Sequence, residues 1–163
     1  MANFDEHINH SKKNLDYLSK INFHINERWD WQVTVCFYTA LHLMNAHIVK
    51  KTLKNYLSHN QVEDILNPYT LSPARLDETT FLSYIKLSQL SRRSRYLLSE
   101  NFTKTDDIQH ASITHSPHFK KAIHHLDVII KYINVNYNNS ISSTNISCLD
   151  LKGRTFENFK ITS

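Results

Sequence analysis

The residues of this chain best suited to chemistry are three arginines within four positions, Arg92, Arg93 and Arg95. At helical spacing, Arg95 shares one face with small and aromatic residues that leave room beside its guanidinium. That face comprises Tyr84, Ser88, Ser91 and Arg95. A guanidinium held in this way can bind a phosphate or a carboxylate through paired hydrogen bonds. The alternative is that Arg95 pairs with an acidic residue inside the protein or at a subunit interface, as buried arginines generally do.

The other two arginines take different positions around the same helix. Arg92 lies on its flank beside Tyr96, whereas Arg93 aligns with Lys86 and Gln89 and is expected to face solvent. The candidate residues for binding phosphate or RNA are therefore Arg92, Arg93, Arg95 and Tyr96.

Two histidines are candidates for proton transfer. His42 lies in an apolar segment, on the same helical stripe as Tyr38, and an unperturbed histidine titrates near neutrality. It could act as a general acid or base, or it could be a core histidine bonded to a carbonyl or to Tyr38. His59 is expected in a loop or at a helix start, where it could line a cleft or cap the helix. The candidate catalytic residues are Arg95, His42 and His59.

The sequence gives less support to a metal site or to a nucleophilic cysteine. The close histidine pairs are His7/His10, His115/His118 and His124/His125. No cysteine or carboxylate completes a recognisable ligand set with them, so we expect neither a metal nor a cofactor. Cys36 lies in the middle of an apolar helix, which raises the pKa of a thiol and makes it inert.

The composition restricts the fold to helices. The chain has 163 residues with one glycine and three prolines, whereas average usage would give roughly a dozen glycines. Hairpin sheets, Rossmann turns and phosphate loops need glycine for positive φ or close backbone approach. The sole glycine is Gly153, in the last part of the chain, so an all-α fold is expected.

The charge and the apolar segments bear on partners and location. A net charge of +4, with eleven histidines counted as neutral, suits nucleic acid but also an ordinary solvated surface. No apolar segment is long enough to span a membrane, and the first residues lack the apolar core of a signal peptide. Two cysteines, Cys36 and Cys148, cannot form a disulfide framework and are expected as free thiols. We therefore expect a cytoplasmic protein without a membrane partner.

Periodicity predicts four long helices, over residues 3–22, 30–53, 77–99 and 116–137. The second is apolar almost all the way round, so it should be central and touch several helices or a second subunit. Its two neighbouring stripes are Trp31, Val35, Tyr38, His42, Asn45 and Val49, and Phe37, Leu41, Met44 and Ile48. Ser116 is the expected cap of the fourth helix, with Pro117 at its first position.

The remaining segments are less regular. A short helix is expected at residues 61–66 and a polar loop at residues 103–114. Beyond residue 137, a composition rich in Asn, Ser and Thr predicts a polar tail with little core of its own, although apolar residues near its end could dock it as a short extended segment. The expected architecture is an up-and-down four-helix bundle over residues 1–137, with a short additional helix and a polar C-terminal tail at residues 138–163.

Two segments resemble the HEPN superfamily of prokaryotic toxin and defence proteins. WDWQVTVCFYTALHLMNAHIV, residues 29–49, is similar to the second-helix pattern of that family, an aromatic start followed by FYxALH. YIKLSQLSRRSRY, residues 84–96, is similar to its third-helix pattern. SHNQVEDIL, residues 58–66, stands where some members have a histidine before a short helix. The resemblance covers about residues 3–137.

The resemblance implies a helical bundle that dimerises. In active members it also implies a metal-independent ribonuclease, in which the arginine of an R-x4–6-H motif grips the scissile phosphate and the histidine assists attack by the 2′-hydroxyl. This sequence departs from that pattern, because no arginine is followed by a histidine five to seven positions later. The departure favours a domain that binds without cutting.

The leading interpretation is a non-catalytic, homodimeric module that binds RNA, a nucleotide or a partner protein in a prokaryotic defence or toxin–antitoxin system. One alternative is a metal-independent endoribonuclease that combines Arg95 with His42 or His59, which fails if Arg95 is buried against a carboxylate. Another is a structural component of a larger assembly, which a large exposed apolar patch on the second or fourth long helix would favour. Exposure of Trp29, Tyr56 or Tyr69 would favour single-stranded RNA, because its bases stack on aromatic rings.

Overall fold

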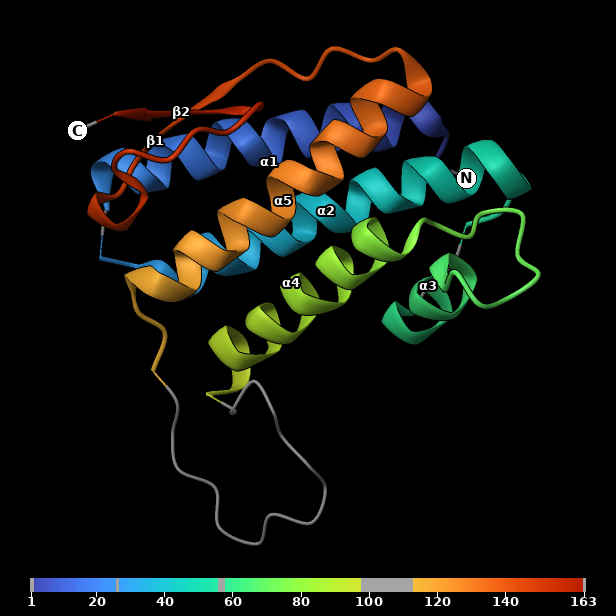
Figure 1. Cartoon of the computed structure of the whole chain (residues 1–163), viewed down its shortest axis with the longest axis horizontal. Helices are drawn as coiled ribbons and strands as arrows, with labels where there is room; N and C mark the ends of the chain where they lie inside the picture. Colours follow the sequence, from blue (N-terminus) through green and yellow to red (C-terminus); the bar gives the residue numbers. More distant parts are fainter. Residues whose placement is uncertain (1, 26, 56–57, 98–112, 163) are drawn as a thin grey trace, which may run out of the picture.

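The computed structural model describes residues 2–25, 27–55, 58–97 and 113–162. Within these residues five α-helices pack around one core, and a short 3-10 helix and two short strands follow the last of them (Figure 1). The helices are α1 (Phe4–His24), α2 (Trp29–Thr52), α3 (His59–Leu66), α4 (Glu78–Tyr96) and α5 (Ser116–Tyr137). The all-α bundle predicted from the composition is confirmed.

The four long helices alternate in direction along the chain, and α2 is central (Figure 1). It packs against α1, α4 and α5, and the short α3 also contacts it. The helix bounds follow the predicted ranges closely, because apolar spacing and local capping both depend on nearby residues.

Side chains that accept from backbone N–H groups begin three of the helices. Asn3 and Glu6 form a reciprocal capping box at α1, and Ser58 and Gln61 form one at α3. The Asp77 carboxylate accepts from the third residue of α4. The expected cap of α5 is wrong by one position, because Ser116 is already helical and His115 is the cap residue.

Three helices end in a left-handed residue although the chain has almost no glycine. Leu53, Leu97 and Asn138 have φ values of 57°, 55° and 47°. Leu53 closes α2 by donating its backbone N–H to the Val49 carbonyl at 2.9 Å. A leucine in this conformation carries a steric penalty that glycine would avoid.

The core fills the space between α2 and its neighbours. Of the two stripes on α2, the one that contains Phe37, Met44 and Ile48 is buried. The stripe with Trp31 and Tyr38 is the more exposed one. Phe119, Ile123, Leu126, Ile130 and Ile133 of α5 are fully buried.

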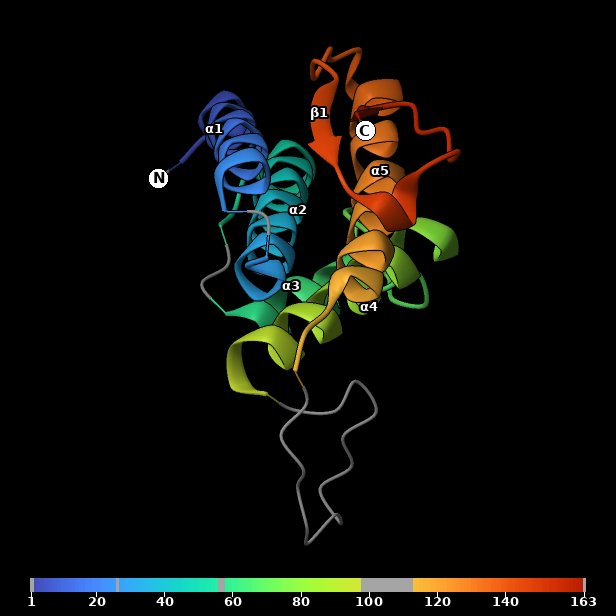
Figure 2. The ribbon, with the colours of Figure 1, turned by 90° about the vertical axis from the view of Figure 1, so that its left-hand side faces the viewer.

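The segment after α5 differs from the expectation of a tail with little core. Its strands β1 (Thr144–Ser147) and β2 (Phe159–Thr162) pair in parallel, with the 3-10 helix η1 (Leu149–Leu151) between them. β1 lies between α1 and α5, and η1 contacts α5 (Figure 2). Five of its apolar side chains are buried: Ile141, Ile146, Cys148, Leu151 and Phe159. Composition missed this packing because a few apolar residues, widely spaced among polar ones, are enough to fill one gap in the bundle.

Two polar side chains, one buried and one half-buried, attach this segment to the helices. Asn22 of α1 accepts from the Ser147 N–H at 2.7 Å and donates to the Ser147 carbonyl at 3.0 Å, as a neighbouring strand would. Asp127 of α5 accepts from the backbone and side-chain N–H groups of Asn158, at 2.8 and 3.0 Å. The polar residues of the tail are thus part of its anchoring.

Candidate nucleic-acid interface on α2 and α4

The Arg95 guanidinium lies among aromatic rings. Its central carbon is 6.0 Å from the Phe37 ring centroid, 5.9 Å from that of Tyr38 and 5.2 Å from that of Tyr96. Each of these distances is within the range of cation–π attraction. The Arg95 Nε also donates to the Ser91 carbonyl of its own helix at 3.4 Å. The planar group is therefore held at one edge, and within the described residues its remaining N–H donors make no hydrogen bond.

Arg95 has no acidic partner within the described part of the chain. The ion pairs there join Lys20 to Asp16, Arg28 to Asp30, and Lys131 to Glu157. The nearest acidic residue that lines the same cavity is Asp30, and Arg28 engages its carboxylate through two hydrogen bonds, at 3.2 and 3.1 Å. The expected alternative, an internal Arg95–carboxylate pair, does not occur among these residues.

The Asp30 carboxylate is also held in its charged form. Burial acts to raise its pKa, but the hydrogen bonds from Arg28 and from backbone N–H groups outweigh burial, so the pKa lies below its usual value. Its charge is thus matched by Arg28, and among the residues that the structure describes no carboxylate pairs with Arg95.

The cavity beside Arg95 opens at the surface. Its volume is about 190 Å³, and it is lined by Asp30, Trp31, Thr34, Ser94 and Arg95. Trp31 is 55% exposed, although it lies in the first turn of α2, a helix with most of its residues buried. Tyr38, two turns along α2, is 37% exposed, and Tyr96 is 61% exposed. Two accessible rings, those of Tyr38 and Tyr96, therefore lie beside the guanidinium, and a third, that of Trp31, lines the same cavity. We call Trp31, Tyr38, Arg95 and Tyr96 the aromatic–arginine face.

Of the three aromatic residues whose exposure would favour single-stranded RNA, the structure describes two. Trp29 is half-buried, with its ring 5.4 Å from that of Phe119, so it belongs to the core. Tyr69 is 78% exposed, and its hydroxyl donates to Glu78 at 2.9 Å. Tyr56 lies outside the described residues. The exposed aromatic residues on α2 itself, Trp31 and Tyr38, were not predicted.

The two remaining arginines of the cluster separate. Arg92 is exposed. Arg93 is not the solvent residue that the helical spacing predicted, because it is half-buried and donates to the Ile113 carbonyl at 2.9 Å. Arg93 therefore ties α4 to the residues before α5, and Arg92 is the exposed member of the pair.

His59 lies against the same phenylalanine ring as Arg95. As the first residue of α3, it places its ring centroid 5.4 Å from that of Phe37. Its Nδ1 is buried and has no hydrogen-bond partner within the described residues. The structure thus brings two of the three predicted catalytic residues to one ring.

Tyr84 and Ser88 line the interior beside this group. The Tyr84 ring is fully buried and lies 6.0 Å from that of Phe37, and burial followed by the Glu63 charge raises its pKa. Ser88 donates to the Glu63 carboxylate at 3.2 Å. Of the four residues predicted to share one face, Tyr84, Ser88 and Ser91 are buried, and Arg95, at the solvent end, is half-buried.

His42, the third predicted residue, belongs to a different cluster. Its Nδ1 lies 3.2 Å from Nδ1 of His7, and its ring centroid lies 4.0 Å from that of His10. Burial, then the neighbouring His10 and His7, lowers its pKa to about 4, so the ring is neutral at pH 7. Among the described residues no hydrogen bond or ring contact joins His42 to Arg95.

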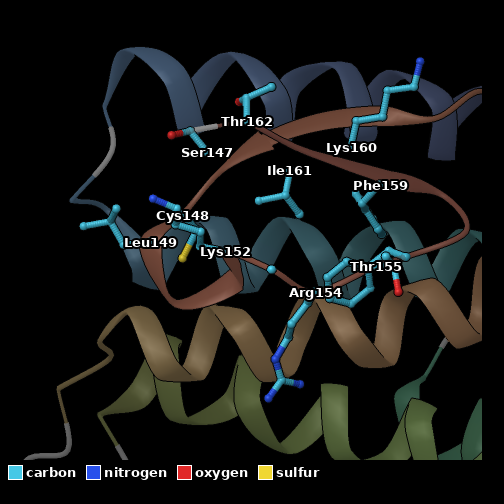
Figure 3. A pocket seen from close by; sticks show the side chains of 12 residues that line it. Ser147, Cys148, Leu149, Lys152, Arg154, Thr155, Phe159, Lys160, Ile161 and Thr162 are labelled. Carbon is cyan, nitrogen blue, oxygen red and sulfur yellow. The ribbon is translucent and has the colours of Figure 1, made fainter.

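A second cavity lies in the C-terminal segment (Figure 3). Its volume is about 450 Å³, and its lining includes Lys152, Arg154 and Lys160. In Figure 3, Arg154 and Lys160 point in opposite directions rather than toward a common point. The cavity therefore lacks the convergent cations that an anion site needs.

From the sequence we expected two free thiols and no metal ion. Cys36 and Cys148 are buried and free, and burial raises the pKa of both thiols. Within the described ranges, no three or more His, Cys, Asp or Glu side chains are arranged to hold a metal ion. No helix in those ranges is long and apolar enough to cross a membrane.

Comparisons with family models, with curated proteins and with solved structures find no match to this chain. The resemblance to HEPN proteins therefore stays an expectation drawn from the segments quoted above.

Proposed function

We propose that this chain is a HEPN-like helical module that binds single-stranded RNA at the aromatic–arginine face without cutting it. The observation that carries the proposal is the Arg95 guanidinium, which lies against three aromatic rings, has no carboxylate partner among the described residues and stands beside the exposed Trp31. An accessible cation without a matching anion is suited to an anionic ligand.

The chemistry of single-stranded RNA fits the two kinds of group on this face. Exposed aromatic rings provide platforms on which unpaired bases stack, and an arginine offers phosphate a planar set of donors. Arg92, exposed one helical turn from Tyr96, adds attraction for the backbone. A free nucleotide offers a phosphate and a base as well, but it would use only part of a surface that extends from Trp31 to Tyr96.

A protein partner is supported less well. The proposal of a structural component required a large exposed apolar patch on α2 or α5. Among the described residues of α5, the one exposed large apolar side chain is Val135. The exposed large apolar side chains of α2 are Trp31 and Tyr38, which already belong to the aromatic–arginine face. The homodimer, the cytoplasmic location and the defence or toxin–antitoxin setting are parts of the proposal that rest on the sequence and on the resemblance.

A second candidate, a metal-independent endoribonuclease, is supported by a separate observation. Arg95 and His59 lie against the same Phe37 ring, and the buried Nδ1 of His59 has no partner among the described residues. In that hypothesis Arg95 would hold the scissile phosphate and His59 would exchange a proton with the 2′-hydroxyl or the leaving group. His42 is not needed, because its neighbours are His7 and His10.

The experiment that separates these hypotheses measures binding and cleavage of single-stranded RNA in EDTA. Wild type is compared with Arg95→Ala, His59→Ala and His42→Ala, each first checked for folding by circular dichroism and for oligomeric state. We expect uncleaved RNA with every protein and weaker binding by Arg95→Ala alone. Cleavage that disappears in folded Arg95→Ala and His59→Ala would establish the nuclease, and absence of both binding and cleavage would favour a protein partner.

A further inference from the structure

The protonation of the His7 ring is determined by its neighbours at the start of α1. The Asn55 side-chain amide donates to the Ala2 carbonyl at 3.0 Å, which fixes the orientation of the amide. Its oxygen therefore faces Nε2 of His7, at 3.0 Å. Because a carbonyl oxygen only accepts, Nε2 carries the proton of the neutral ring. Nδ1 of His7 is consequently the nitrogen with the free lone pair.

That lone pair is directed at a second histidine. Nδ1 of His42 lies 3.2 Å from Nδ1 of His7, across the contact between α2 and α1. His7 is buried and His42 is half-buried, so both rings are held by packing. In the absence of an ion, Nδ1 of His42 carries the proton and donates it to His7.

The pair opens into a hollow of about 390 Å³ that is lined by Ala2, Glu6, His7, His10 and His42. His10 is exposed, and its ring stacks on His42 rather than joining the two nitrogens. Glu6 is occupied as the acceptor of the Asn3 N–H at 2.7 Å. The hollow therefore offers Nδ1 of His7, Nδ1 of His42 and room for water. A site with two protein ligands agrees with the finding that no three or more His, Cys, Asp or Glu among the described side chains are arranged to hold a metal.

We propose that Nδ1 of His7 and Nδ1 of His42 together bind one divalent transition-metal ion of the nickel, copper or zinc class, with water filling the remaining positions. Imidazole nitrogens suit these metals and not magnesium or calcium, which prefer oxygen. Two nitrogens each about 2.0–2.1 Å from a tetrahedral zinc ion lie roughly 3.3–3.4 Å apart, close to the 3.2 Å separation observed. A ring N–H held by a carbonyl oxygen, as in His7, is also the usual outer contact of a metal-binding histidine.

Binding of the metal ion in place of the proton between the two rings conserves the number of protons. The metal replaces the proton shared by the two Nδ1 atoms, and His42 then carries its proton on Nε2, so both rings stay neutral. The bound ion would join α1 to α2 and stabilise their contact. The proposal departs from the sequence-based expectation of no metal, because the sequence shows His7 and His10 on one helix but does not show that His42 lies beside them.

The test is calorimetric titration of the full, untagged chain with NiCl2 and with ZnCl2 in metal-free buffer. We expect one tight site in wild type. We expect about tenfold weaker binding in Asn55→Ala, which keeps both ligands but releases the His7 tautomer, and a larger loss in His7→Gln and His42→Gln. His24→Gln, at the other end of α1, is the matched control and should bind as wild type does. Wild-type affinity in His7→Gln and His42→Gln would overturn the proposal.

A second measurement on wild type avoids any variant that fails to fold. Substoichiometric Cu²⁺ broadens the NMR signals of nearby imidazoles, and the His7 and His42 rings should broaden before the other histidines. Earlier broadening at His115 and His118, the histidine pair at the start of α5, would overturn the assignment of the site.

Discussion

Arg95 of α4 and His59 of α3 lie against the same phenylalanine ring, with the Arg95 guanidinium carbon 6.0 Å and the His59 ring centroid 5.4 Å from the centroid of Phe37. The two residues belong to different helices and are brought together by their common packing on α2. Neither has a carboxylate partner among the described residues. The proposed binding function and its catalytic alternative therefore share one location, and variants of these residues and of their exposed neighbours distinguish the two.

Removing the exposed indole should weaken RNA binding without loss of stability. Trp31 is more than half exposed and offers a stacking platform, so we expect Trp31→Ala to lose about 1–3 kcal/mol of binding free energy. Its midpoint of thermal unfolding should change little, since exposed substitutions usually have small effects. Fluorescence anisotropy with a labelled single strand measures the affinity. Tyr69→Ala, which removes another exposed ring, is the control, and an equal loss in both variants would contradict a defined face.

The buried Asn22 should be required for docking of the C-terminal segment. Asn22→Leu keeps an approximate volume but removes the hydrogen bonds that Asn22 makes to the Ser147 backbone groups and to Gln32. We expect a loss of about 2–4 kcal/mol in the free energy of unfolding, and faster hydrogen exchange in β1. Asn9→Leu, on the exposed surface of the same helix, should leave both unchanged. Unaltered exchange in Asn22→Leu would show that the apolar contacts are sufficient.

Stability should fall between neutral and acid pH because of His125. Burial, followed by the charges of His124, Lys86 and Lys121, lowers its pKa to about 4. An unfolded histidine binds its proton near pH 6.5, so the unfolded state holds more protons between these values and stability decreases as the pH falls. Since the ring is partly exposed, we expect a contribution of about 1–2 kcal/mol. Urea unfolding at pH 7 and pH 4 should show a smaller loss in His125→Gln, and identical losses would contradict this assignment.

Replacing one left-handed leucine should stabilise the protein. Leu53 is 81% exposed and has a φ of 57°, so glycine would relieve strain without removing core contacts. The greater freedom of glycine in the unfolded chain offsets part of the gain, and we expect Leu53→Gly to raise the free energy of unfolding by about 0.5–1 kcal/mol. Leu53→Ala is the control, because it trims the side chain but keeps the strain. A stability of Leu53→Gly no higher than that of Leu53→Ala would contradict the argument.

The helices were predictable from sequence because their signals are local. Glycine scarcity excluded hairpin folds, and apolar spacing placed α1, α2, α4 and α5. The surroundings of a side chain depend instead on segments far away in the chain. Helical spacing alone could not show that Ile113 covers Arg93, or that His7 approaches His42.

The polarity of the two stripes of α2 could have predicted which of them is exposed. It contains Tyr38, His42 and Asn45, whereas its neighbour contains Phe37, Leu41, Met44 and Ile48. The more polar stripe is the one that the structure leaves accessible, which would have identified Trp31 and Tyr38 as surface rings. The C-terminal segment had no comparable periodicity, since its buried residues are spread over two short strands and the turns between them.

The most direct test of the proposed function compares Arg95→Ala with Arg75→Ala for binding to single-stranded RNA over a range of salt concentrations. Arg75 is exposed just before α4 and Arg95 lies in its last turn, so the two positions are separated by most of the helix, which extends about 25 Å from its first residue to Arg95. Both variants remove one positive charge. We predict that Arg95→Ala binds at least tenfold more weakly and loses about 0.7 from the slope of log K against log salt, while Arg75→Ala stays within twofold of wild type. Equal affinities and slopes for the two variants would contradict an RNA site centred on Arg95.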